Sequence, residues 1–107
     1  MLLIPEDIKR LIPPLYTNED LAPESIKVPL KIFDPGGRGT WYITEFDGED
    51  TLFGFCCSPL GSDCDELGYV SLEELQSVKN RFGIGMERDI NWNPGTTLKQ
   101  VIEGEKR

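Results

Sequence analysis

Residues 40–57 read TWYITEFDGEDTLFGFCC, two apolar segments separated by a polar turn. Residues 40–46 and 51–57 are rich in β-branched and aromatic side chains, a composition that favours strands. The four residues between them, DGED, are typical of turns. The stretch therefore predicts two adjacent antiparallel strands, with 51–57 as the central strand because it is the most apolar run.

Residues 27–33, on the N-terminal side, alternate apolar with polar or proline residues, the pattern of a strand with one wet face. The turn cluster DPGGRG at 34–39 joins this segment to the strand at 40–46, so the two are expected to form a hairpin. Because Pro29 has no backbone N–H to donate, the segment is predicted to lie at an edge of the sheet.

Further strands are predicted at 66–70 and 84–92, and a first helix at 5–12. Ser71 and Thr97 each begin a capping box, in which a side chain three residues later reaches back to the capping residue. The boxes predict two more helices. The helix after Ser71 is expected to run to about residue 81, burying a stripe made of Leu72, Leu75, Val78 and Phe82 and ending at Gly83. The fold class is α+β, a small central antiparallel sheet of four to five strands packed with two to three helices.

A length of 107 residues fits one domain, 1–107, with enough chain to bury a core. The loop at 15–25, anchored by Leu15, Tyr16 and Leu21, and the tail at 103–107 are the parts expected to be mobile. Hydrophobic residues at 38% and charged residues at 28% are near globular averages and argue against a membrane span. The opening residues MLLIPED lack the basic and long apolar regions of an export signal, so we expect a cytoplasmic location.

Histidine is absent, which removes the usual catalytic base at neutral pH and the commonest ligand of transition metals. Cys56, Cys57 and Cys64 form an odd set and are expected to be reduced. A zinc site built from Cys57 and Cys64 with the carboxylates of Asp63 and Asp65 is an unusual alternative, and a redox pair of Cys57 with Cys64 is another.

The negative charge is concentrated in one stretch. Residues 39–78 contain nine acidic and no basic residues, a net charge of −9, whereas the rest of the chain has eleven basic and ten acidic residues, a net charge of +1. A field of this sign repels phosphate backbones and attracts basic proteins or cations. We therefore expect a basic protein as partner and no direct binding to nucleic acid.

The acidic residues at the ends of the predicted strands are the candidate site. They form two groups, which could meet at one end of the sheet: Glu45, Asp47, Glu49 and Asp50 in the first, and Asp63, Asp65 and Glu66 in the second. The leading hypothesis is a non-catalytic acidic module that binds a basic protein surface. The alternative is a cation-dependent enzyme or metal-binding protein that uses the same carboxylates. No catalytic residue and no cofactor are predicted.

Six aromatic residues lie on or beside the predicted strands. Aromatic rings on a sheet can stack on bases, but such surfaces also need Lys or Arg, which the central strands lack. We therefore expect these rings in the core: Trp41, Tyr42, Phe53, Phe55, Tyr69 and Trp92.

Four segments resemble a family of short bacterial proteins catalogued as domain of unknown function twenty-nine fifty-eight. They read TWYITE, LFGFC, ELGYVSLEEL and ERD, beginning at residues 40, 52, 66 and 87, and their order and spacing agree with the family over most of the chain. The resemblance implies a bacterial protein of a kind common on plasmids and other mobile elements. It implies no activity, cofactor or site residue.

Overall fold

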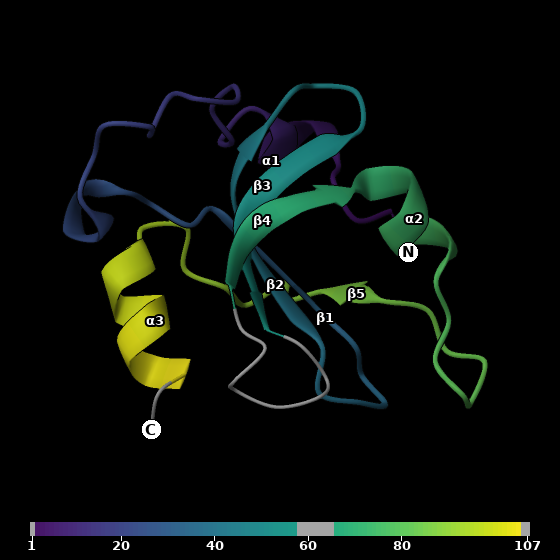
Figure 1. Cartoon of the computed structure of the whole chain (residues 1–107). Helices are drawn as coiled ribbons and strands as arrows, with labels where there is room; N and C mark the ends of the chain where they lie inside the picture. Colours follow the sequence, from purple (N-terminus) through teal and green to yellow (C-terminus); the bar gives the residue numbers. More distant parts are fainter. Residues whose placement is uncertain (1, 58–65, 106–107) are drawn as a thin grey trace.

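The computed structural model describes residues 2–57 and 66–105, and within them five strands form one antiparallel sheet in the order β4-β3-β2-β1-β5 (Figure 1). The strands are β1 (Leu30–Phe33), β2 (Thr40–Phe46), β3 (Thr51–Cys57), β4 (Glu66–Ser71) and β5 (Glu87–Arg88). The helices in the described ranges are α1 (Glu6–Lys9), α2 (Leu72–Ser77) and α3 (Leu98–Glu105), with a short 3-10 helix, η1 (Pro23–Ser25). The predicted α+β fold is confirmed.

β2 and β3 form an antiparallel hairpin inside the sheet, as predicted from residues 40–57, but the prediction of 51–57 as the central strand is wrong, because β2 is the middle strand and β3 lies between β2 and β4. Its turn is organised by Asp47, whose Oδ1 accepts the backbone N–H groups of Glu49, Asp50 and Thr51 at 2.8, 2.8 and 3.0 Å. Gly48 in the turn has a φ of +90°, which a residue without a side chain adopts readily. Local turn chemistry therefore fixes the register of the two central strands.

Pro29 does not place its strand at an edge of the sheet. β1 begins at Leu30, after the proline, and pairs with β2 on one side and with β5 on the other. Pro29 lies outside both ladders, so its missing donor costs neither of them a hydrogen bond. The prediction of an edge strand is wrong, and the outer strands are β4 and β5.

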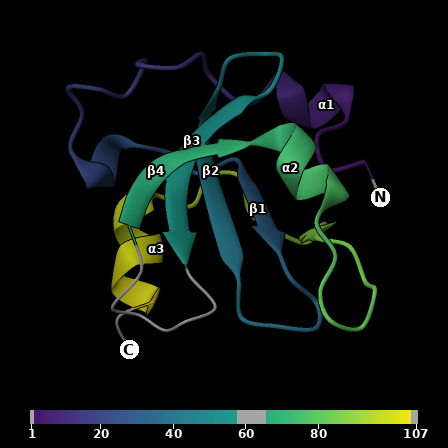
Figure 2. The same ribbon diagram turned by 45° about the vertical axis from the view of Figure 1, so that its right-hand side comes forward.

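The sheet separates two hydrophobic clusters, one on each face, and Figure 2 shows α1 and α2 on one side of the sheet and α3 on the other. The first face is covered by the N-terminal residues around α1 and by α2, which contributes Leu75. The second face is covered by α3, which contributes Leu98 and Val101, and by the chain leading to β1, which contributes Ile26 and Val28. Both sides of the sheet are thus partly buried.

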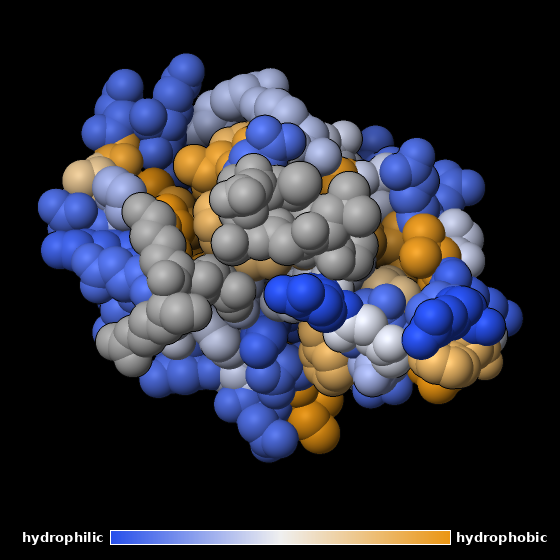
Figure 3. Space-filling view, turned by 60° about the horizontal axis from the view of Figure 1, so that its bottom comes forward, coloured by the Kyte–Doolittle hydropathy of each residue, from blue (hydrophilic) through white to orange (hydrophobic). Residues whose placement is uncertain are grey.

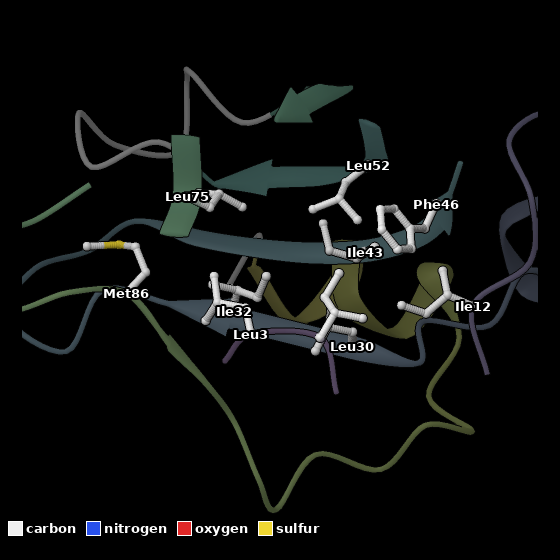
Figure 4. Packing of buried hydrophobic residues seen from close by; sticks show 10 residues of the cluster. Leu3, Ile12, Leu30, Ile32, Ile43, Phe46, Leu52, Leu75 and Met86 are labelled. Carbon is white, nitrogen blue, oxygen red and sulfur yellow. The ribbon is translucent and has the colours of Figure 1, made fainter. Parts of the chain in front are cut away.

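Around the residues drawn in grey, the side of the molecule seen in Figure 3 exposes mainly hydrophilic residues, with hydrophobic residues in small separate groups. The close view of the first face shows the buried apolar side chains that lie over β1, β2 and β3 (Figure 4). In this cluster Ile32, Ile43 and Leu52 are fully buried. Burial of such side chains is the main source of stability for a domain of this size.

A β-bulge interrupts the pairing of β2 with β3. Ile43 lies opposite Gly54, but Glu45 lies opposite Phe53, so Thr44 is the extra residue. The Thr44 hydroxyl donates to the Phe53 carbonyl at 3.1 Å. Because a bulge moves all later side chains to the other face, Glu45 shares the second face with Phe53.

Both predicted capping residues begin helices. The Ser71 Oγ accepts the Glu74 N–H at 3.2 Å, at the start of α2. At α3 the capping box is complete, because the Gln100 N–H donates to the Thr97 Oγ1 and the Thr97 N–H donates to the Gln100 side chain. These caps satisfy N–H groups that have no partner inside the helix.

Helix α2 ends earlier than the sequence predicts. It stops at Ser77, and Val78 and Phe82 are 44% and 60% exposed instead of buried. The Asn80 side chain accepts the N–H groups of Phe82 and Ile84, and this local bonding competes with a continued helix. The predicted buried stripe is therefore wrong beyond Leu75.

Three other predicted boundaries also change. The helix predicted at 5–12 spans only α1, and the strand predicted at 84–92 is regular only over β5. The tail predicted to fray from residue 103 is helical as far as Glu105. Of the helices found in the described ranges, none combines the length and apolar character required to cross a bilayer.

Candidate binding cavity

A cavity of about 330 Å³ lies on the second face of the sheet, under the segment 16–23 that precedes β1. We call this segment the strap. The cavity floor is formed by β2, β3 and β4, and Ile26 and Leu98 contribute to its lining. The remaining lining residues are Tyr16, Asn18, Glu19, Leu21, Pro23, Thr44, Glu45, Phe53, Leu67 and Tyr69.

Glu45 fastens the strap to the sheet. Its side chain is buried, with 4% exposure for the residue, and its two carboxylate oxygens accept the N–H groups of Tyr16 at 2.9 Å and Asn18 at 2.7 Å. Hydrogen bonds to the charged form compensate a carboxylate for losing water. The bulge at Thr44 directs Glu45 to this face, so an irregularity in the ladder positions the anchor of the strap.

Tyr16 has a backbone φ of 70°, the left-handed region that a residue with a side chain seldom adopts. The bond from its N–H to Glu45 helps to hold this conformation. The sequence predicted Leu15, Tyr16 and Leu21 as anchors of a loop, and Leu15 is half-buried. Tyr16 and Leu21 are 62% and 46% exposed and border the cavity.

Three aromatic rings gather at the cavity. The rings of Phe53 and Tyr69 are tilted by 58° with centroids 4.9 Å apart, and the Tyr69 hydroxyl is hydrogen-bonded to the Tyr16 side chain. This hydrogen bond raises the pKa of Tyr69, and partial desolvation and the negative charges of Glu45 and Glu19 raise it further. Glu45 and Glu19 therefore lie close enough to the phenol for their negative charges to favour its protonated form.

The predicted acidic site is divided between separate structural roles. Glu45 anchors the strap, as described above, and Asp47 organises the β2–β3 turn. Asp50 supports the start of α2, where its carboxylate accepts the Ser71 hydroxyl at 2.8 Å and the Glu73 N–H at 2.7 Å. Glu49 is exposed at the turn.

The two acidic groups do not meet at one end of the sheet. Glu66 pairs with Cys56 near the end of β3, whereas the turn that contains Asp47 and Asp50 precedes the start of β3. Seven residues of an extended strand span roughly 20 Å, so Glu66 lies far from that turn. The predicted convergence is wrong for these residues, and Asp63 and Asp65 lie outside the described residues.

The thiols give no sign of a metal site within the described ranges. Cys56 and Cys57 point to opposite faces of β3, and Cys64 lies outside the described residues. Burial raises the pKa of the Cys56 thiol, and the charge of Glu66 raises it further, so the reactive thiolate is disfavoured. In residues 2–57 and 66–105 no three Cys, Asp or Glu side chains gather as ligands for one metal ion.

The sequence interpretation missed most of the cavity. Tyr42 and Phe55 are buried as predicted for the aromatic residues, but Tyr69 is 57% exposed. The alternation of residues 66–70 could have indicated the exposure of Tyr69, because it places Leu67 and Tyr69 on one face of an outer strand. Glu19 offered no signal, because its position depends on the path of the strap.

Asp47 provides a pH-dependent prediction. The backbone N–H groups of Glu49 and Asp50, and that of Thr51, hold the pKa of Asp47 below its ordinary value. Its stabilising effect is therefore complete above the ordinary aspartate pKa and is lost as pH falls through the lowered folded value. We expect the stability difference between wild type and Asp47→Asn to shrink on acidification, measured by urea unfolding between neutral and acidic pH. A difference that stays constant over that range would contradict the assignment.

Comparisons with known proteins identify a family. The family model described as "Protein of unknown function (DUF2958)" matches residues 2–106, nearly the whole chain. Searches of the curated proteins and of the solved structures give no match. The resemblance found in the four sequence segments is thereby confirmed at the level of the family: this chain belongs to the DUF2958 family of proteins of unknown function.

Proposed function

We propose that this protein is a non-catalytic binding module whose cavity accepts a cationic side chain, Arg or Lys, from a basic partner protein. The observation that carries the proposal is the composition of the cavity. Two carboxylates, Glu19 and Glu45, and the aromatic rings of Tyr16, Phe53 and Tyr69 line it, and within residues 2–57 and 66–105 no Lys or Arg is among the lining residues. Acidic groups beside aromatic faces are the chemistry that recognises an ammonium or guanidinium group.

The surroundings of the cavity favour the same ligand. The strap and η1 contain Glu19, Asp20 and Glu24 and no basic residue, and all three acidic residues are exposed. The strands of the cavity floor belong to residues 39–78, which also lack basic residues. A field of one sign speeds the encounter with an oppositely charged partner and makes binding weaker at high salt.

The cavity volume suits one side chain. At about 330 Å³ it lies at the lower end of the range of ligand pockets, roughly 300–1,000 Å³. An arginine or lysine can fill much of this space with its aliphatic stem against Leu21 and Leu67 and its charge near Glu19. A protein segment that presents such a residue is therefore the ligand we propose, in a bacterial cytoplasm as the sequence and the family resemblance imply.

A catalytic role has less support from the same residues. The hydroxyls of Tyr16 and Tyr69 bond to each other, and the raised pKa of Tyr69 disfavours the phenolate that a general base would need. Glu45 already accepts two backbone N–H groups, which engages it as an anchor instead of a base. The cation-dependent enzyme considered from the sequence relied on carboxylates that the fold separates.

The test uses four decapeptides that differ only at one central residue, Arg, Lys, Gln or Glu, in an alternating Thr and Val background with serines at both ends. Calorimetric titration at low salt should detect binding of the Arg and Lys peptides and none of the Gln and Glu peptides. Replacing Tyr69 by Leu, which removes the ring but keeps an apolar side chain, should weaken Arg-peptide binding about tenfold, because a cation–π contact is lost.

Two matched variants test whether the negative charge at the cavity, and not elsewhere on the strap or η1, attracts the ligand. Glu19→Gln should weaken binding of the Arg peptide about fivefold, the upper end for an exposed ion pair. Glu24→Gln removes the same charge from η1, outside the cavity lining, and should change the affinity less than twofold. Equal affinity for all four peptides, or equal effects of the two variants, would overturn the proposal.

A further inference from the structure

The outer edge of β4 is an open strand edge beside the cavity. β4 pairs with β3 along its whole length, from Glu66 opposite Cys56 to Ser71 opposite Thr51. Within residues 2–57 and 66–105, no strand pairs with its other edge. Figures 1 and 2 show β4 as the outermost strand on this side of the sheet.

The ladder defines which backbone groups of β4 face outward. The Leu72 N–H donates to the Asp50 carbonyl at 2.7 Å, directly beyond the pair of Ser71 with Thr51. Hydrogen-bonded and non-hydrogen-bonded pairs alternate in an antiparallel ladder. Gly68 and Val70 therefore bond to β3, whereas Leu67 and Tyr69 direct their N–H and C=O groups away from it.

This edge lacks the usual protection against another strand. Protected edges are typically very short, or contain Lys, Pro or a bulge. β5, at the opposite side of the sheet, has only two residues. β4 has six, contains no Lys or Pro, and keeps an unbroken register with β3. Its one charged residue is Glu66, at the start.

We propose that an extended basic segment of the partner protein adds to β4 as a further strand and thereby delivers its Arg or Lys side chain to the cavity. This inference rests on the proposed function. Leu67 and Tyr69 serve both roles, because their backbones face the added strand and their side chains line the cavity. Residues opposite them on an added strand place their side chains on the same face of the sheet.

The charges near β4 favour a basic segment of a partner protein over a second copy of this chain. Glu66 at the edge and Glu19 on the strap attract a basic segment, whereas two copies would bring the same acidic groups together. Strand addition gives affinity through main-chain hydrogen bonds, and the cavity gives specificity through one side chain. A partner with alternating small or β-branched residues and one Arg or Lys fits both requirements.

The test is backbone N-methylation of the Arg decapeptide. An added strand directs alternate N–H groups toward β4, so three N-methyl groups on residues of one parity should weaken binding more than tenfold by removing hydrogen bonds. Three N-methyl groups on the alternate residues, whose N–H groups point away from β4, should change the affinity less than threefold. The two peptides are matched in composition, and unequal loss is an effect that side-chain binding alone does not produce.

Amide hydrogen exchange supplies a second measurement. On saturation with the unmodified peptide, exchange at Leu67 and Tyr69 should slow at least tenfold, whereas exchange at Gly68 and Val70, already bonded to β3, should change little.

Acetylarginine methylamide, which is too short to form a strand, tests binding in the cavity without strand addition. If it binds while both methylated peptides bind equally well, strand addition is overturned and the cavity proposal stands. If neither acetylarginine methylamide nor the Arg decapeptide binds, both the cavity proposal and the strand-addition proposal are wrong. A β4-to-β4 dimer in sedimentation would also overturn the inference.

Discussion

Replacing Gly54 by alanine is expected to destabilise the protein by about 3 kcal/mol, because an added Cβ would overpack a site formed by backbone. Gly54 lies opposite Ile43 at the bulge, and its new Cβ would overlap the Tyr42 carbonyl and lie 2.9 Å from the Ile43 Cα. These atoms belong to the neighbouring strand and cannot rotate away. The change should appear as a lower midpoint of urea unfolding.

Gly68→Ala is the matched control for this prediction. Gly68 pairs with Gly54 across β3 and β4, but a Cβ built at Gly68 has nothing within 4 Å. Alanine there should change stability by less than about 0.5 kcal/mol, as at most open surface positions. Equal effects of the two substitutions would mean that the close approach at the bulge does not exist.

Replacing Glu45 by glutamine is expected to destabilise the protein by about 2 kcal/mol, within the range for hydrogen bonds to a charged group. The amide can accept one of the two N–H groups of Tyr16 and Asn18, but its NH₂ group then faces the other donor. Tyr16 would also lose support for its left-handed conformation. The loss should be measured by urea unfolding and by faster amide exchange at Tyr16 and Asn18.

Glu49→Gln serves as the control for the change at Glu45. Glu49 is also acidic and lies four residues away, but its side chain is exposed at the turn. Its replacement should leave stability and strap exchange unchanged within error. If Glu45→Gln behaves like Glu49→Gln, then Glu45 does not fasten the strap, and the cavity loses its upper wall.

The sheet could be predicted because its information is local. Alternation, turn residues and capping boxes defined β2, β3, β4 and the starts of α2 and α3 from neighbouring residues alone. The errors arose where other side-chain contacts compete with these signals. The predicted helix to residue 81 fails because the Asn80 side chain accepts the nearby N–H of Phe82. The same side chain also donates to Asp34, which is 46 positions away in the chain.

The site could not be predicted from charge alone. The clustered acidic residues predicted a binding site, but a carboxylate in a folded protein often accepts backbone N–H groups, as Glu45, Asp47 and Asp50 do. Glu66 is separated from Asp47 and Asp50 by the length of β3, which begins after their turn and pairs with Glu66 near its end. The cavity depends instead on a bulge and on the path of the strap, neither of which has a sequence signature.

The central claim is that the cavity recognises positive charge, and it is tested most directly by titrating ¹⁵N-labelled protein with acetylarginine methylamide and with its neutral isostere, acetylcitrulline methylamide. The account predicts saturable shifts of the amide signals of Tyr16, Phe53 and Tyr69 with the arginine compound only, with an affinity about fivefold weaker in Glu19→Gln. Equal shifts with both compounds, or shifts confined to residues outside the cavity, would contradict it.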